Sequence, residues 1–188
     1  MFKTLAAVCL AAITTVPIAA QSNSAPEKFT AFAVNVSNMT TRAQTSPVDV
    51  TINRWSSDAD RDRLLAILKE KGQEGLLDAL QKMPVVGYLT TPGSLRYDLH
   101  YARNTRLPEG GERIVLGTDR YIGSCEAVNR PRTIDYPFTV IELEVDKDGR
   151  GVGKASIYTK ITATDDHTIE LENFANEPVM LNDVKKVK

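Results

Sequence analysis

Two long stretches of alternating residues, FTVIELEVD (138–146) and GVGKASIYTKITAT (151–164), constrain this chain most strongly, and a short link, KDGR, joins them. Period-two alternation rich in β-branched residues is typical of strands that bury one face. Asp148 and Gly149 supply the backbone conformations that a tight hairpin turn requires. A phosphate-binding loop would need a helix directly after these glycines, whereas a strand follows. The sequence therefore predicts an antiparallel hairpin within a mainly β fold.

The same alternation recurs along most of the chain. It is found in FTAFAVNV (29–36), in VDVTINRW (48–55) and in LRYDLHYARNTRL (95–107), where Tyr97 and Tyr101 are predicted to share one face. Shorter stretches follow the same pattern, namely VVGYLTT, RIVLGTDR, TIELENF and PVMLNDVKKV. Eight or nine strands with tight links predict an antiparallel meander, closed as a barrel or split as a sandwich.

One region, 57–83, has a helical pattern instead. Ser57 and Asp60 have the spacing of a capping pair, and a leucine stripe follows them. Lys71 and Gly72 carry the signals of a helix end, after which a second leucine stripe stops before Pro84. We predict a two-helix insertion between strands 2 and 3, packed on the sheet because a leucine stripe needs an apolar partner.

The first 20 residues are typical of a secretory signal peptide. They contain an early lysine, an apolar run too short to favour a membrane span, and small residues before a predicted cleavage after Ala20. Residues 21–28 are polar and are predicted to form a flexible lead-in, and 29–188 to form one β-rich domain. We expect a secreted or periplasmic protein, without a membrane span in its mature chain.

Charge and cysteine content narrow the classes further. The 23 basic and 24 acidic residues are nearly balanced, which argues against a nucleic-acid partner or an anionic membrane held by bulk charge. Only Cys125 remains after the predicted cleavage, so an internal disulfide is excluded in that mature chain. Two distant histidines and one cysteine do not have the spacing of a zinc site, and we expect neither a metal nor another cofactor.

The long connection 119–137 is the most unusual stretch, since ordered connections of this length are usually functional. The stretch holds Arg120, Arg130, Arg132 and Tyr136, and its arginines could bind a carboxylate or a phosphate in a bidentate manner. The alternative is structural: the loop crosses one end of a barrel, and its arginines cap strand-end carbonyls. The predicted ligand-binding residues are Arg120, Arg130, Arg132, Tyr136, Tyr97 and Tyr101.

An enzymatic interpretation depends on few residues. His100 has Asp98 two positions away on the predicted polar face of its strand, and a carboxylate there could orient the imidazole. Cys125 could act as a thiol nucleophile if nearby arginines lowered its pKa. A solvated strand face and a buried, inert cysteine explain the same residues, so no catalytic residue is assigned.

Four stretches, VDVTINRWSSDADRDRLL, LRYDLHYAR, RIVLGTDR and YPFTVIELEVDKDGRGVGK, resemble a group of uncharacterised secreted bacterial proteins. The resemblance covers most of the chain after residue 20 and implies no activity and no site residue.

Three functions remain open for this chain. The first is an exported non-enzymatic β-domain that binds a small apolar or amphipathic ligand in a cavity enclosed by its strands. The second is an envelope protein–protein interaction module, and the third is a hydrolase or thiol enzyme. We expect a monomer.

Overall fold

The computed structural model describes residues 25–35, 44–119, 135–164, 169–173 and 178–187. Its one helix is α1 (Asp58–Gln81), between the second and third strands. The ten strands are β1 (Glu27–Asn35), β2 (Gln44–Ile52), β3 (Gly87–Thr90), β4 (Tyr97–Leu99), β5 (Tyr101–Arg106), β6 (Glu112–Thr118), β7 (Phe138–Val145), β8 (Arg150–Ala163), β9 (Ile169–Asn173) and β10 (Val179–Val187).

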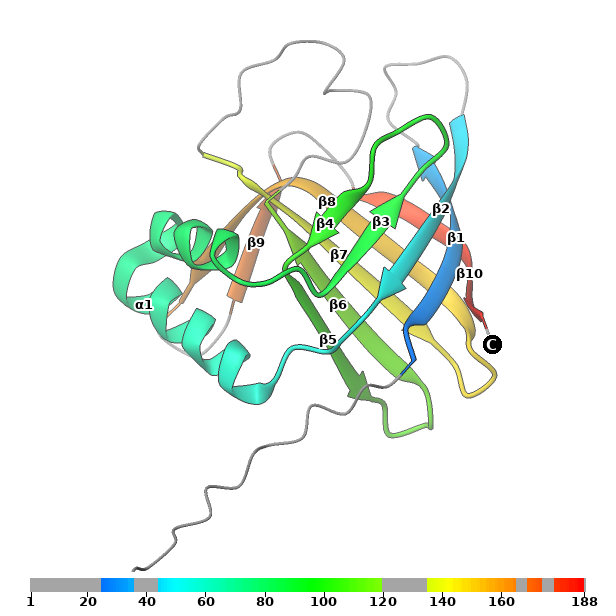
Figure 1. Cartoon of the computed structure of the whole chain (residues 1–188), viewed down its shortest axis with the longest axis horizontal. Coiled ribbons are helices and arrows are strands. Elements are labelled where there is room, and N and C mark those ends of the chain that lie inside the picture. Colours follow the sequence, from blue (N-terminus) through cyan, green and yellow to red (C-terminus); the bar gives the residue numbers. More distant parts are fainter. Residues whose placement is uncertain (1–24, 36–43, 120–134, 165–168, 174–177, 188) are drawn as a thin grey trace, which may run out of the picture.

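Nine of these strands form one antiparallel, nearly closed barrel in the order β4-β3-β2-β1-β10-β8-β7-β6-β5, and β9 pairs with β8 beside this path (Figure 1). The predicted barrel-like β fold is confirmed. The order departs from a simple meander at one place, because β10 lies between β1 and β8. The predicted hairpin is β7–β8, with Gly149 at φ 75° in its turn.

The barrel closes through a bent strand. β4 ends at Leu99 and pairs with β3, whereas β5 begins at Tyr101 and pairs with β6. Between them, the His100 backbone N–H donates to the Gly117 carbonyl over 3.1 Å. The two ends of the sheet are thus consecutive in the chain.

This bend changes which side chains face the interior. Tyr97 and Leu99 are buried inside the barrel, and beyond His100 it is Ala102, not Tyr101, that joins the interior cluster. Tyr101 instead contacts the residues beneath α1. The predicted shared face of Tyr97 and Tyr101 is therefore wrong, because unbroken alternation does not continue through a bend.

The interior holds one continuous apolar cluster supplied by all sides of the barrel. Its fully buried side chains include Phe29, Leu116, Ile141, Leu143 and Val184. Burying a side chain of this size stabilises a fold by about 1.5–3 kcal/mol, so the packed interior is the main source of the barrel's stability.

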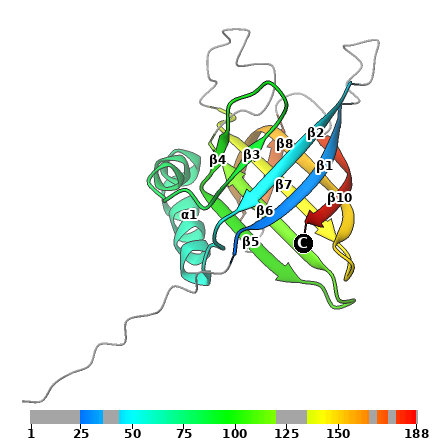
Figure 2. The ribbon, with the colours of Figure 1, turned by 45° about the vertical axis from the view of Figure 1, so that its right-hand side comes forward.

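α1 lies outside the barrel along one side of it (Figures 1 and 2). Its predicted start is confirmed: the Asp60 N–H donates to Ser57 Oγ over 3.1 Å, and the Ser57 N–H donates to Asp60 Oδ2 over 2.9 Å. The predicted two-helix insertion is not what forms. Gly72, at φ 65° and ψ −161°, kinks a single helix that continues at once from Gln73, so no loop separates two helices.

One end of the barrel carries an ionic cluster. Lys186 Nζ on β10 lies 2.7 Å from Glu27 Oε2 on β1 and 3.1 Å from Glu112 Oε2 on β6. The Trp55 indole N–H donates to Glu27 Oε1 over 2.8 Å. These ion pairs thereby join β6 to β1 and β10, which are distant from it in the sheet. Within the described residues, no helix combines the length and the apolar character needed to cross a membrane.

Candidate functional site

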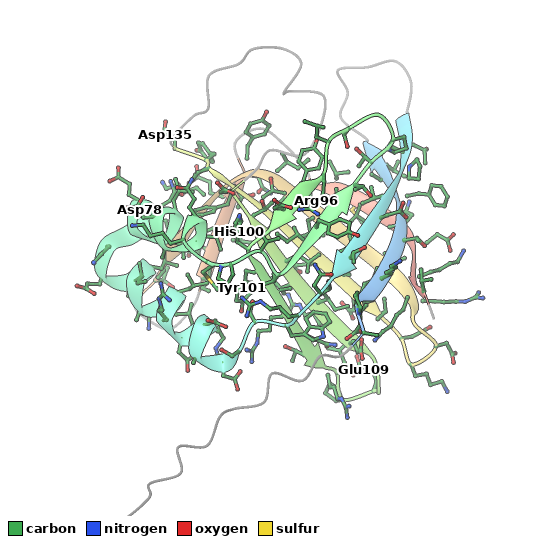
Figure 3. All side chains as sticks on the ribbon, viewed as in Figure 1. Asp78, Arg96, His100, Tyr101, Glu109 and Asp135 are labelled. Carbon is green, nitrogen blue, oxygen red and sulfur yellow. The ribbon has the colours of Figure 1, made fainter. Side chains whose placement is uncertain are left out.

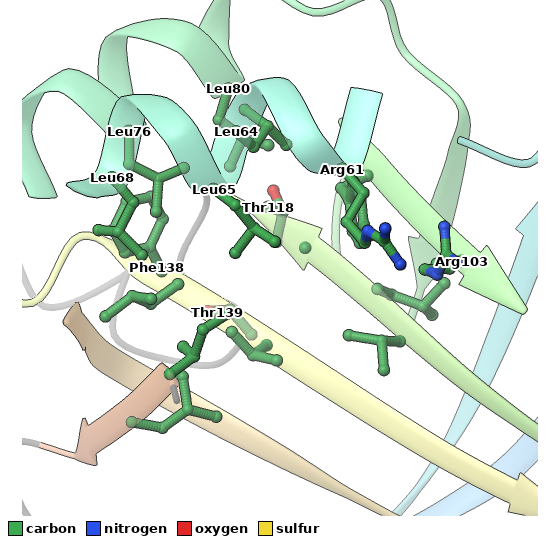
Figure 4. Close-up of a pocket in the computed structure, with 18 of the residues that line it drawn as sticks. Arg61, Leu64, Leu65, Leu68, Leu76, Leu80, Arg103, Thr118, Phe138 and Thr139 are labelled. Atoms are coloured by element: carbon green, nitrogen blue, oxygen red, sulfur yellow. The ribbon is translucent and has the colours of Figure 1, made fainter. Parts of the chain in front are cut away.

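A cavity of about 360 Å³ lies between α1 and the outer face of the barrel (Figure 4). Leucines of α1 line one wall, and side chains of β5 to β9 line the other. We call it the helix–barrel pocket. Its apolar lining includes Leu65, Leu68, Val115, Gly117, Phe138 and Val140.

The sheet wall is apolar because the strands beneath α1 are apolar on both faces. In β6 and β7, Leu116 and Ile141 are opposite one another and point into the barrel. Val115 and Val140, one residue away in each strand, therefore point outwards. Gly117 is opposite Tyr101 and has no side chain, so the pocket is deeper at that position.

One end of the pocket is closed by tight packing. Leu68, Leu76 and Leu80 of α1 form a buried cluster with Phe138, which is 1% exposed. Ile161 of β8 packs against the same cluster. These contacts hold α1 on the barrel and make this end of the pocket apolar.

The other end is charged. Arg61 on α1 and Arg103 on β5 line it, opposite the end formed by Leu68 and Phe138 (Figure 4). Arg103 Nη1 lies 2.7 Å from Asp58 Oδ1, and this hydrogen bond holds the pKa of the Asp58 carboxyl below its usual value. Arg61 Nη2 lies 2.6 Å from Asp62 Oδ1.

Tyr101 lies between these arginines and the apolar end, on the side of the barrel that faces α1 (Figure 3). Burial raises the pKa of its phenol, although the nearby Arg103 and Arg61 act in the opposite direction. The phenol therefore remains protonated at neutral pH and keeps an O–H that can donate.

Glu142 is the only carboxylate that lines the helix–barrel pocket within the described residues. Its Oε2 lies 3.1 Å from Arg113 Nη2 and 3.4 Å from Lys154 Nζ. Two cations thus neutralise this carboxylate from the outer face of the sheet.

Of the six predicted binding residues, the structure describes three, and these three lie at different places. Tyr97 is buried in the barrel, and Tyr101 lines the helix–barrel pocket. The Tyr136 hydroxyl donates to Glu172 Oε1 over 2.8 Å, away from the pocket lining. Arg120, Arg130 and Arg132 lie outside the described residues, as do residues 1–20, the predicted signal peptide, and most of the long connection.

The enzymatic interpretation pairs His100 with Asp98, and the structure describes both residues. His100 Nδ1 donates to the Met83 carbonyl over 2.9 Å, and its Nε2 lies 3.9 Å from Asp119 Oδ1. Asp98 instead pairs with Arg96, whose Nε lies 2.9 Å from Asp98 Oδ1. The predicted orientation of His100 by Asp98 does not form. Cys125 lies outside the described residues.

A second hollow, of about 420 Å³, lies between the turns at 107–111 and 146–150. Its lining includes exposed charged side chains such as Glu109, Lys147 and Arg150. Five of its ten lining residues are charged, whereas small-molecule sites are lined predominantly by hydrophobic and aromatic side chains. Among the described residues, no three His, Cys, Asp or Glu side chains lie close enough together to hold a metal ion.

Sequence reasoning missed Arg61, Arg103 and Val140. One sequence feature pointed to this region: β7 is apolar on both faces near Phe138. Such a strand indicates that another element packs against its outer face. Nothing in the pattern indicated that the helical insertion supplies that cover.

No family model, curated protein or solved structure matches this chain, in keeping with its resemblance to proteins without a known activity.

Proposed function

We propose that this chain is an exported, non-enzymatic β-domain that binds a small amphipathic ligand in the helix–barrel pocket. The observation that carries the proposal is a cavity of about 360 Å³ with apolar walls and a few polar groups at one end. Small-molecule sites are typically concave and mostly apolar, with volumes of about 300–1,000 Å³. The pattern of residues 1–20 supports the export part of the proposal.

The location of the site differs from the expectation of a cavity enclosed by strands. The barrel interior is occupied by its own side chains, such as Phe29 and Leu143, whereas the helix–barrel pocket is outside it. A ligand in this pocket would lie between α1 and the barrel wall.

The test is a titration of the purified mature protein with 11-(dansylamino)undecanoic acid, whose fluorescence reports an apolar environment. Val140→Phe places a larger side chain in the pocket and is expected to weaken binding at least about tenfold. Val152→Phe is the matched control, because Val152 is 55% exposed and lies outside the pocket lining. We expect it to bind as the wild type does.

Two results would reject this proposal: the wild type shows no saturable binding, or Val140→Phe binds the probe as tightly as the wild type. Native mass spectrometry of the protein purified from its own envelope complements the titration, since a co-purifying small molecule would identify the natural ligand.

One observation favours the alternative of an envelope interaction module. β9 is short, and among the described strands it pairs only with β8. Its Ile169 and Leu171 are 45% and 39% exposed. An unpaired strand edge with apolar side chains can pair with a strand of another protein. A pull-down in which Ile169→Lys removes an enriched envelope protein would support this alternative.

A further inference from the structure

The helix–barrel pocket has a gradient of polarity along its length. Its two arginines, Arg61 and Arg103, lie at one end, and Leu68, Leu76 and Phe138 lie at the other (Figure 4). A ligand that fills the pocket must therefore present a polar group at one end and an apolar group at the other.

The arginines can accept an additional anion. A guanidinium has five N–H donors, and the ion pairs with Asp58 and Asp62 use one or two of them. Asp58 and Asp62 are 77% and 62% exposed at their side chains. Ion pairs with such exposed partners contribute about 0–1 kcal/mol, so a better placed anion can share or replace them.

The remaining groups at this end also favour an anion over a cation. Glu142 already has Arg113 and Lys154 as partners, and it offers no free charge to a cationic group. The Tyr101 phenol remains neutral and can donate its O–H. The ion pairs of these residues join four cations (Arg61, Arg103, Arg113 and Lys154) to three carboxylates (Asp58, Asp62 and Glu142).

The size of the pocket favours one apolar tail over two, because about 360 Å³ is near the lower end of the range for small-molecule sites. Resting on the proposed function, we infer that the ligand is an anionic single-chain amphiphile. Its headgroup, a carboxylate or a sulfate, binds Arg103 and Arg61, and its tail lies against Leu68, Leu76 and Phe138. Headgroups with two or more oxygens that share the negative charge suit a guanidinium, since two parallel N–H···O hydrogen bonds form.

The test compares four probes that share a dodecyl chain and differ in the headgroup. They are dodecanoate, dodecyl sulfate, dodecyltrimethylammonium and dodecyl maltoside, each titrated below its micelle concentration by displacement of the neutral dye N-phenyl-1-naphthylamine. We expect the two anionic probes to bind at least about tenfold more tightly than the cationic probe. Comparison of dodecanoate with dodecyl sulfate shows whether the pocket prefers a carboxylate or a sulfate headgroup.

Variants assign the selectivity to Arg103. Arg103→Gln is expected to weaken the anionic probes about tenfold and to leave dodecyl maltoside unchanged. Arg106→Gln on the same strand makes the same change in net charge at an exposed position outside the pocket, and is expected to change nothing. Arg103→Lys, which keeps the charge and loses the bidentate geometry, should be intermediate. Far-UV circular dichroism checks that each variant is folded.

The outcomes separate this inference from the proposed function. If none of the four probes displaces the dye, both fail. If all four bind equally, the binding function stands and the preference for an anion is rejected. If Arg103→Gln weakens the maltoside as much as the anions, Arg103 acts through packing, which also rejects the inference.

Discussion

Two glycines, Gly151 on β8 and Gly117 on β6, show how the space around a residue limits which side chain it can carry. A Cβ added at Gly151 would lie 1.8 Å from the Glu144 carbonyl oxygen, which is backbone and cannot rotate away. A Cβ added at Gly117 would meet nothing closer than the Tyr101 Cβ at 3.4 Å, an ordinary contact. Gly151 is therefore required by the close approach of β8 to β7, whereas Gly117 only leaves space in the pocket.

From this difference we predict opposite effects of one substitution. Gly151→Ala is expected to destabilise the protein by about 1–3 kcal/mol, because the β7–β8 pair must separate. Gly117→Ala is expected to stabilise it by up to about 0.5–1 kcal/mol, since glycine weakens a strand interior relative to alanine. Urea unfolding of both variants measures the two changes. Equal free energies of unfolding for the two variants would contradict this account.

At the scale of elements, α1 is anchored by a glutamine as well as by leucines. The Ile161 backbone N–H of β8 donates to Gln73 Oε1 over 3.2 Å, and Gln73 Nε2 donates to the Asp135 carbonyl over 2.9 Å. β7 ends its pairing with β8 at Thr159, so this N–H lies just beyond the strand pair. The side chain of Gln73 thus provides an acceptor for a backbone N–H of β8 that β7 does not reach.

Gln73→Ala is expected to cost about 1 kcal/mol of stability, because the part-buried Ile161 N–H loses its acceptor. Hydrogen exchange at the Ile161 amide should accelerate in this variant. Glu74→Ala, at the adjacent exposed position of α1, is the control and should leave the exchange rate unchanged. An unaltered Ile161 rate in Gln73→Ala would show that the anchor is not needed.

Elements were predictable from the sequence where one local pattern determined them. The Ser57–Asp60 cap, the leucine stripes and the β7–β8 turn all follow from spacing within a few residues. The continuation of α1 past Gly72 and the bend at His100 were not predictable, because both depend on packing between distant segments. The pocket was missed for the same reason: it needs α1 to be placed over Val115 and Val140.

At the scale of the molecule, the Lys186 cluster ties β10 to β1 and to β6, which lies on another side of the barrel. Burial alone would lower the pKa of Lys186, but hydrogen bonds with Glu27 and Glu112 outweigh it and raise that pKa above 10.5. A raised pKa in the folded state favours the charged ammonium. The resulting stability is present below pH 10.5 and is lost as the pH rises through the folded-state pKa.

We therefore predict that Lys186→Met lowers the free energy of unfolding by about 1 kcal/mol at pH 8, since two part-buried carboxylates lose their cation. The difference from the wild type should shrink as the pH rises above 10.5. Lys185→Met, at an exposed position paired with Asp183, is the control. A Lys186→Met deficit that stays constant up to pH 12 would point to lost packing on Phe29 rather than to charge.

The position of β10 between β1 and β8 also affects the order in which the strands can pair during folding. β1 forms near the start of the chain, yet one of its two neighbours is the last strand of the sheet. Contacts so far apart in sequence form slowly, and the edges of β1 and β8 stay open until β10 arrives. The wall cannot be completed before residues 179–187 have been synthesised. If residues 1–20 direct export while synthesis continues, β1 crosses the membrane before its neighbour β10 has been made.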